Sequence, residues 1–493
     1  MWTFLISITA LITGYVLYGR FIERFFGIDK NRKTPAYTKQ DGIDYIPMKP
    51  WKVFMIQFLN IAGLGPIFGA ILGAAYGPWA YVWIVLGCIF MGSVHDYFSG
   101  MLSIRNGGAS LPELVGKYLG VSIQQILRVF TVLLLVFVGV AFVTGPAGLL
   151  ASLTSGGKMI WLYAIFAYYL LATLLPINKI IGKIYPIFGI ALLFMAVSIA
   201  VMMMIKGFSG ESVVMMMIKG FSGELSMIEI SSSSLKNWHS LPEKNLLYPM
   251  MFIVISCGAI SGFHATQSPM MARCLKNENQ GRKIFYGAMI AEGIVAIIWA
   301  TAAMNYFGGV DALNKTLAEH GNNAAWVVDE ISRSWLGKIG AIFAIIGVIA
   351  LPISTGDTAF RSARLTVADM FKFKQKSISS RLVVSIPLFV LGFILSQLDF
   401  ATVWKYLGLS NQILASFVLW TGAMYLKREN KFHWLLSVPA FIMTTICVTY
   451  FLVAPNLSGG LSLNPSLGYL LGLAIGIVIA SFWALSAYRK KQQ

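Results

Sequence analysis

The apolar residues of this chain are gathered into long blocks that are separated by shorter, basic stretches. An α-helix crosses the hydrocarbon core of a bilayer in roughly 17 to 25 residues, which is the length of these blocks. The pattern predicts an all-α polytopic membrane protein with about thirteen transmembrane helices. The expected segments are residues 2–19, 53–75, 79–103, 129–150, 159–175, 180–205, 246–268, 284–307, 339–356, 382–398, 402–425, 434–454 and 467–488.

Composition excludes a soluble globular protein, because 57% of the 493 residues are hydrophobic and only 12% are charged. The net charge of +18 comes from basic residues between the apolar blocks, which favours membrane topology over nucleic-acid binding. Of the 38 Lys and Arg residues, 29 fall in stretches on one predicted side of the membrane and eight on the other. Basic loops stay in the cytoplasm, so we expect the N-terminus outside and the C-terminus inside.

The first apolar block has no basic residue before it and is followed by Arg20 and Arg24. This order is the reverse of a signal peptide, so we expect a membrane helix here.

The cysteines form no CxxC pair and have no metal-ligand spacing. We expect them to be small buried side chains, and we expect no metal site and no cofactor. They are Cys88, Cys257, Cys274 and Cys447.

The stretch from Asn60 to Gly77 is apolar but makes a poor helix interior. It has three glycines and a proline between Gly63 and Gly69. A glycine costs about 1 kcal/mol inside a helix and a proline about 3 kcal/mol, so we expect a helix break. Unpaired backbone groups are tolerated at membrane depth only where they face protein or a water-filled cavity, which makes the break a candidate substrate site.

A second glycine-interrupted stretch runs from Ser256 to His264 in the seventh expected segment. It starts five spans after the first, and because five is odd, two five-helix units beginning at these segments have inverted topology. Broken helices at corresponding places of two repeats mark the substrate site of LeuT-type transporters, so we predict a LeuT-like 5+5 inverted repeat. The residues expected to bind substrate are Asn60, Gly63, Gly65, Pro66, Gly69, Ser256, Cys257, Gly258, Ser261, Gly262 and His264.

The predicted repeat divides the chain into five parts. They are an N-terminal helix with a basic cytoplasmic loop (1–52), a first repeat (53–205), an extracytoplasmic loop (206–245), a second repeat (246–425) and two C-terminal helices (426–493). Residues 201–211 recur as 214–224. A single copy is not a solenoid, which needs about three or more stacked units, so we interpret it as a recent duplication or an artefact of sequence assembly.

Glu292 and His264 are ionisable groups inside predicted spans, where such groups are costly and mark functional sites. No Lys or Arg lies within the span of Glu292. Its carboxyl group either exchanges a coupling proton or is a hydrogen-bonded structural acid. His264 closes the second break, and it either contacts substrate or a proton or is simply packed.

His95 and Asp96 follow Trp79 by roughly 25 Å at about 1.5 Å per residue, which puts them near the cytoplasmic end of their segment. The pair is either interfacial and hydrated or couples a proton to transport.

Asp357 is expected near the inner end of segment 339–356. Arg361 and Arg364 follow on the same helical face, which favours a structural ion pair. The eighth helix of a LeuT-type core faces the first break, and here it carries hydroxyl groups suited to Na+, so sodium coupling is an alternative. These hydroxyl residues are Ser354, Thr355 and Thr358.

The sequence contains no Walker loop, HExxH motif or nucleophile elbow. These absences argue against an ATP-driven pump and against a membrane hydrolase, and we expect no enzyme activity.

Three motifs occur in the order of a known family. They are the run from Asn60 to Gly69 with the pair His95 and Asp96, the run from Cys257 to His264, and the run from Thr355 to Arg361. With these motifs the sequence resembles the carbon starvation protein A (CstA) family. The resemblance implies uptake across the bacterial inner membrane, with short peptides as the usual substrate and pyruvate with a proton in some relatives.

The leading hypothesis is therefore a secondary active transporter that takes up short peptides with a coupling ion, H+ before Na+. The peptide carboxylate would dock at half-helix N-termini in the two breaks, and Glu292 or His264 would meet the amine or carry the proton. The alternative is a symporter of pyruvate or another monocarboxylate, which needs no amine site. A channel or a membrane sensor is a further alternative.

Overall fold

The computed structural model describes residues 1–493 except 43, 155, 175–180, 210–227, 346, 348, 350, 376, 399 and 490–493. Every regular element within this described part is a helix, which confirms the predicted all-α class. The second copy of the duplication and the end of the first copy lie outside it.

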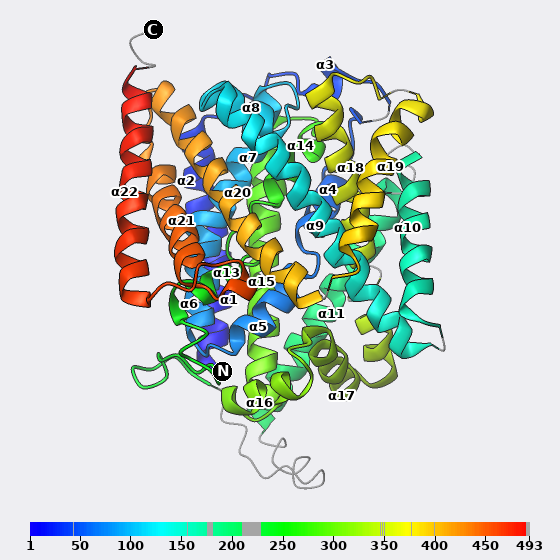
Figure 1. Ribbon diagram of the computed structural model, residues 1–493, viewed down its shortest axis with the longest axis vertical. Coiled ribbons are helices and arrows are strands. Elements are labelled where there is room, and N and C mark those ends of the chain that lie inside the picture. Colours follow the sequence, from blue (N-terminus) through cyan, green and yellow to red (C-terminus); the bar gives the residue numbers. More distant parts are fainter. Residues whose placement is uncertain are drawn as a thin grey trace.

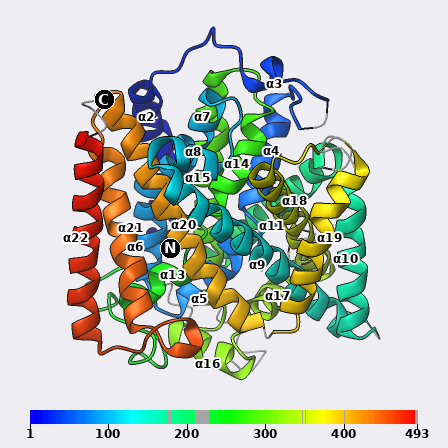
Figure 2. The same cartoon turned by 45° about the horizontal axis from the view of Figure 1, so that its top comes forward.

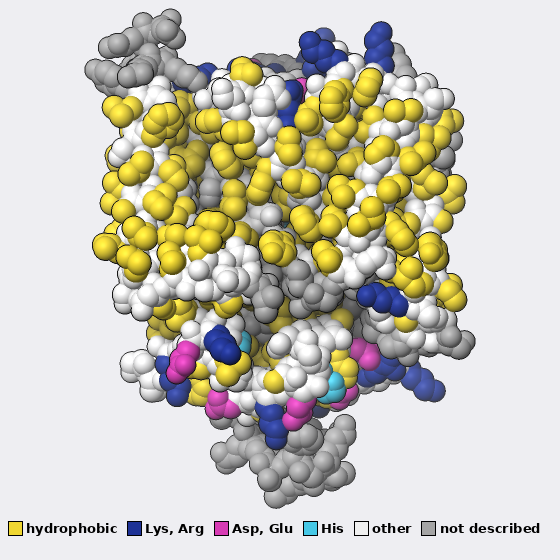
Figure 3. Space-filling model, viewed as in Figure 1, with side chains coloured by type: hydrophobic (Ala, Val, Ile, Leu, Met, Phe, Trp, Pro, Cys, Tyr) yellow, Lys and Arg dark blue, Asp and Glu magenta, His cyan; other side chains and the backbone are white. Residues whose placement is uncertain are grey.

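Eight described helices are long and apolar enough to cross a membrane, and a bent pair, Pro50–Ile61 with Gly65–Ala74, adds a ninth crossing if it is one span. Apolar side chains cover the middle of the molecule, and charged side chains gather at its two ends (Figure 3). The chain is a multi-pass membrane protein; the count of thirteen spans stays a prediction. The eight spans are Trp2–Phe26, Trp79–Arg105, Val121–Gly148, Phe188–Lys206, Glu278–Tyr306, Ile378–Leu395, Trp434–Val453 and Pro465–Ala487.

The N-terminal half begins at α1 and ends with α11. Its elements are α1 (Trp2–Val16), α2 (Tyr18–Phe26), α3 (Pro35–Thr38), α4 (Pro50–Ile61), the π-helix η1 (Gly65–Gly69), α5 (Ala70–Ala74), α6 (Trp79–Gly87), the π-helix η2 (Cys88–Gly92), α7 (Ser93–Arg105), α8 (Leu111–Tyr118), α9 (Val121–Leu153), α10 (Lys158–Leu174) and α11 (Ile181–Ser209).

The C-terminal half begins with a short π-helix and ends with α22. Its elements are η3 (Leu247–Met251), α13 (Phe252–Val254), α14 (His264–Ala272), η4 (Glu278–Gln280), η5 (Arg282–Tyr286), α15 (Gly287–Tyr306), α16 (Val310–Glu319), α17 (Ala324–Ile345), α18 (Leu351–Phe371), α19 (Ile378–Leu395), α20 (Phe400–Arg428), α21 (Trp434–Val453), η7 (Asn456–Ser458) and α22 (Pro465–Arg489).

The helices stand roughly parallel and surround α15. α1 begins at the end of the molecule where α16 lies, and α22 ends at the opposite end, where α3 and α8 also lie (Figure 1). α22 lies at one edge and α10 at the other in both views (Figure 2). α9 packs along α18, and α14 packs along α7 and α4, so the short broken helices lie inside the bundle.

Local sequence signals explain several helix ends. Ser110 and Glu113 form a reciprocal capping box that starts α8. α2 stops at Gly27, whose left-handed conformation (φ +76°) costs little without a Cβ.

The expected segment 339–356 is wrong in its bounds. α17 ends at Ile345 and α18 runs from Leu351 to Phe371, while part of the region between them lies outside the described residues. The segment was predicted from its run of apolar residues, so it was ended before the charged residues Arg361 and Arg364. These arginines are in fact buried in the bundle, and the helix continues through them. α18 therefore continues 14 residues past Asp357, about 21 Å at 1.5 Å per residue, and Asp357 is not near its inner end.

Candidate functional site

Both helix breaks predicted from the glycines are present. α4 ends at Ile61, the helix resumes at Gly65, and the two halves are bent by 51°. In the second segment α13 ends at Val254 and α14 begins at His264, and residues 255–263 between them are not helical.

The two unwound stretches pack against each other and against α15. A Cβ added to Gly65 would lie 2.3 Å from the Cβ and Sγ of Cys257. Gly258 has a φ of +90°, and a Cβ there would lie 2.6 Å from the Cβ of Ala296. A residue with a Cβ would not fit at either position, so the close packing explains why both positions are glycines. The role of the break residues in binding substrate stays a prediction.

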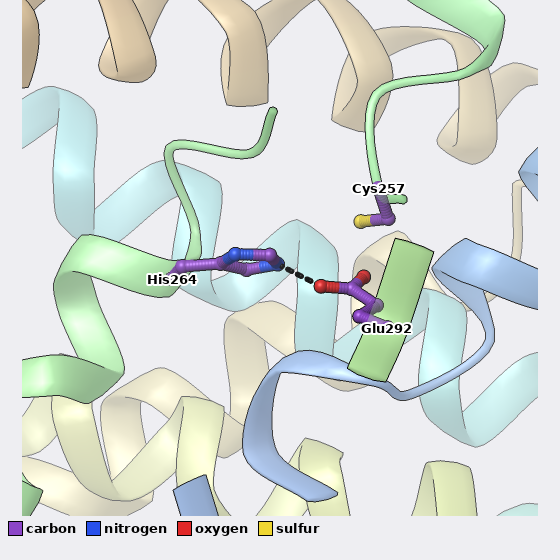
Figure 4. A group of neighbouring side chains, drawn as sticks. All are labelled: Cys257, His264 and Glu292. Atoms are coloured by element: carbon purple, nitrogen blue, oxygen red, sulfur yellow. Dashed lines mark ion pairs between the residues drawn. The ribbon is translucent and has the colours of Figure 1, made fainter. Parts of the chain in front are cut away.

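A chain of four ionisable side chains crosses the second break. His95 Nδ1 lies 2.8 Å from Asp96 Oδ1, and Asp96 Oδ2 lies 2.9 Å from His264 Nδ1. The other ring nitrogen of His264, Nε2, lies 3.4 Å from Glu292 Oε2 (Figure 4). All four side chains have no exposed surface. The structure thus joins α7, α14 and α15 through Glu292, His264, Asp96 and His95, four of the residues predicted to couple an ion.

This arrangement bears on two expectations from the sequence. His95 and Asp96 are not an interfacial, hydrated pair, because both are fully buried and Asp96 contacts His264. Glu292 has an ionisable partner in His264, which comes from α14 rather than from its own span. Its role as a proton-exchanging or a structural acid stays a prediction.

The contacts of His264 leave several buried polar atoms without a hydrogen-bond partner in the described part of the chain. His264 lies between two carboxylates, and neither its Nε2 nor the oxygens of Glu292 make a well-formed hydrogen bond to any described residue. An uncompensated charge in such a place costs several kcal/mol, so this is a place where ionisable groups would share a proton. Their role in coupling an ion stays a prediction.

α18 contacts the first break. Thr355 Oγ1 donates to the carbonyl oxygen of Leu59 at 3.3 Å, and a Cβ on Gly63 would lie 3.2 Å from the same Oγ1. Thr358 Oγ1 donates to the Thr355 carbonyl at 2.8 Å. Ser354 and Asp357 are buried on the same helix. The Thr355 hydroxyl group, on the helix predicted to face the first break, therefore lies beside that break. Sodium binding by these hydroxyl groups stays a prediction. So does the ion pair of Asp357 with Arg361 and Arg364.

Asn411 on α20 is a site residue that the sequence reasoning missed. Its Oδ1 accepts a 2.6 Å hydrogen bond from the Phe263 backbone N–H, and its amide also contacts Ser261 Oγ at 2.9 Å. These bonds satisfy polar groups that the unwound stretch leaves unpaired. The signal available in the sequence is an amide side chain in the middle of the predicted segment 402–425.

The sequence analysis also missed a row of buried polar side chains between α4, α14 and α18. Gln57 Nε2 lies 3.5 Å from Ser268 Oγ, and Gln267 Nε2 lies 3.4 Å from Ser362 Oγ. The side-chain oxygens of both glutamines and the amide of Asn60 are buried with no hydrogen-bond partner among the described residues. Orphaned polar atoms beside a helix break are open to a polar ligand.

Comparison with known proteins identifies the family. The profile described as carbon starvation protein CstA matches residues 1–219, 212–339 and 324–450. The chain belongs to the CstA family. A Haemophilus influenzae protein described as an uncharacterised membrane protein is 43% identical over 356 residues, which cover 64% of this chain and 94% of that protein.

Several relatives carry functional names, and two of them differ in the substrate named. The peptide transporter CstA of Campylobacter jejuni is 29% identical, covering 67% of this chain and 53% of its own length. The pyruvate/proton symporter BtsT of Escherichia coli is 26% identical, covering 62% of this chain and 49% of its own length. The chain thus spans about half the length of these two relatives.

The fold is shared with a solved transporter. A mutant of the manganese transporter of Eremococcus coleocola aligns with 94% of this chain and 99% of its own at a TM-score of 0.52. The sequences are 12% identical, so the likeness concerns the fold alone.

Proposed function

We propose that this CstA-family protein is a secondary active transporter that takes up short peptides across the bacterial inner membrane by alternating access, driven by H+. The observation that carries the proposal is the fully buried chain from Glu292 through His264 and Asp96 to His95 at the second helix break. The relative named as a peptide transporter supports the substrate class, and the one named as a pyruvate/proton symporter supports the proton.

The two broken helices support a LeuT-like 5+5 core. Each is the first helix of a proposed repeat, residues 53–205 and residues 246–425, and their breaks pack together. In such transporters substrate binds between the breaks while the repeats rock around it. The excess of basic residues in one set of loops supports an outside N-terminus and a cytoplasmic C-terminus.

The net charge of these buried side chains explains how proton binding would be coupled to transport. With His264 protonated and both Asp96 and Glu292 ionised, the buried set carries one net negative charge. A proton on Glu292 neutralises it, which favours the closed, dry conformation because burying net charge is costly. Opening to water removes that cost and releases the proton together with the substrate.

The alternative is a monocarboxylate–H+ symporter, which the name of the E. coli relative favours. It needs an anion site at the breaks but no group to meet a substrate amine. A Glu292→Gln variant that keeps pyruvate uptake would favour this alternative over peptide transport.

The test is uptake into liposomes that contain the purified protein. Labelled dialanine and labelled pyruvate are each offered with an inward proton gradient, an inward sodium gradient or no gradient. Accumulation of dialanine only with the proton gradient is the expected result. Accumulation of pyruvate alone moves the assignment to the alternative, and flux without accumulation under any gradient refutes a symporter.

A further inference from the structure

Three metal-binding atoms meet at the second break. Cys257 Sγ, a ring nitrogen of His264 and a carboxylate oxygen of Glu292 all lie within 4.8 Å of one another. Figure 4 shows the three side chains converging from the unwound stretch, the start of α14 and α15. The sequence predicted no metal site, because these residues have no metal-ligand spacing along the chain; the break brings them together.

The orientation of His264 is that of a metal ligand. Its Nδ1 is engaged with Asp96 Oδ2 at 2.9 Å, and Asp96 is in turn held by His95 at 2.8 Å. Histidines that bind metals usually direct one ring nitrogen to a carboxylate in this way, which aims the other at the ion. The aimed atom, Nε2, and both Glu292 oxygens are buried and have no hydrogen-bond partner in the described part of the chain.

The spacing and the donor types define the class of ion. Ligands at about 2.0 to 2.3 Å from a tetrahedral Zn2+ lie about 3.3 to 3.7 Å from each other. The 3.4 Å between His264 Nε2 and Glu292 Oε2 already has this value. The 4.8 Å limit for the set including Cys257 requires a shift of about 1.5 Å or less. A sulfur and an imidazole favour Zn2+, Co2+ or Cd2+ over Mg2+, Ca2+ or Mn2+, which prefer oxygen.

Binding adds no net charge to the bilayer interior. A divalent ion displaces two protons, one from the Cys257 thiol and one shared by His264 and Glu292, so the total charge of the cluster is unchanged. Metal ligands must be deprotonated, and proton release is the ordinary accompaniment of binding.

We propose that Cys257, His264 and Glu292 form a site for one divalent ion of the Zn2+ class, with Asp96 as the group that orients His264. The ion leaves one coordination position to water or another small ligand. A consequence, which rests on the proposed transport function, is that the ion and the coupling proton exclude each other and Zn2+ blocks uptake.

The test uses Co2+ as a spectroscopic probe on the purified full-length chain in detergent. The wild type is expected to bind one Co2+ with a sulfur-to-cobalt charge-transfer band, and Zn2+ should displace it. Cys257→Ser should lose the band, and Asp96→Asn should weaken binding about tenfold or more while keeping the band. Cys447→Ser is the matched control, since this buried thiol is 4.0 Å from Ser416 Oγ and belongs to no such cluster in the described residues.

A second measurement needs no variant. Cys257 is partly exposed, whereas the other three cysteines are buried, so a thiol reagent should label Cys257 in the wild type and Zn2+ should prevent that labelling. Absence of a charge-transfer band in the wild type, or a band that persists in Cys257→Ser, overturns the site. Metal binding without any proton-driven uptake refutes the transport proposal alone, and uptake without metal binding refutes the site alone.

Discussion

His264 and Asp96 are 168 positions apart in the chain, and a 2.9 Å contact between Nδ1 and Oδ2 joins them inside the bundle. The contact ties the helix that follows the second break, α14, to α7. Because Nε2 of the same ring faces Glu292, one imidazole connects two carboxylates from two other helices. A movement of α14 relative to α7 and α15 would change these contacts, so under the proposed function they would link the conformation of the break to the position of a proton.

Replacing Asp96 by Asn tests this link. The change keeps the shape but removes the charge opposite His264, and hydrogen bonds to charged groups are worth about 1.5 to 3 kcal/mol. We expect proton-driven accumulation of substrate to fall about tenfold or more, while exchange of labelled for unlabelled substrate across the membrane continues. Both rates are measured in liposomes. Asp311→Asn, an exposed acid on α16, is the control and should accumulate substrate normally. Full accumulation by Asp96→Asn would contradict the role of the pair.

Replacing Gly65 by Ala tests the contact between the breaks. The new Cβ would lie 2.3 Å from Cys257, and overpacking of this kind costs about 1 to 3 kcal/mol. We expect a lower unfolding temperature and slower uptake, with partial recovery when Cys257 is also changed to Gly. Gly148→Ala on α9 is the matched control, since no atom lies within 4 Å of its added Cβ. Equal stability of the two Ala variants would show that the breaks are not packed in the resting state.

Replacing Asn411 by Leu tests how the second break is held. The Phe263 N–H and the Ser261 hydroxyl would lose their partner in a buried place, at a cost of about 1 to 3 kcal/mol for an unsatisfied group. We expect a lower unfolding temperature in detergent and weaker binding of substrate. Gln125→Ala, an exposed amide on α9, should leave both unchanged. A stable Asn411→Leu protein with normal binding would mean that other groups satisfy the break.

His239 is expected to make the loop of residues 228–246 sensitive to pH. Burial lowers the pKa of His239, and its Nδ1 accepts a 3.2 Å hydrogen bond from the Leu241 backbone N–H, which requires the unprotonated ring. A histidine whose pKa is lower in the folded state stabilises the fold above its ordinary pKa, near 6.5. That stabilisation is lost as the pH falls through this value toward the folded pKa.

We therefore expect the loop of residues 228–246 to be cut faster by a protease as the pH falls from about 8 to about 5. The rate is taken relative to His239→Asn at each pH, which cancels the pH dependence of the protease. His433→Asn, placed just before α21, is the control and should behave as the wild type. A constant ratio of wild type to His239→Asn across this range would contradict the prediction.

The helix breaks could be read from the sequence because their cause is local. Gly63, Gly65, Pro66 and Gly69 each weaken a helix by an amount that depends on the residue itself, whatever surrounds it. Membrane location follows in the same way from the length of the apolar blocks. Glu292 and His264 could be named as candidates in the same way, because an ionisable residue in an apolar span is conspicuous; their role stays a prediction.

The bounds of α18 and the burial of Asp96 could not be read in this way. Arg361 and Arg364 look like the end of a span, yet packing against other helices keeps them inside the bundle. The same holds for Asn411, whose importance depends on the unwound backbone that it faces. Hydropathy reports how well a residue tolerates lipid, and these residues face protein instead.

The sequence by itself determined that this is a helical membrane protein of the CstA type with two broken helices, since these properties depend on composition, motifs and local propensity. Only the tertiary structure decided that His264 connects Asp96 to Glu292 and that Cys257 joins them. Those contacts depend on the rotation of α7, α14 and α15 about their axes and on their depth in the bundle. Both are set by packing among segments far apart in the chain, which no local pattern encodes.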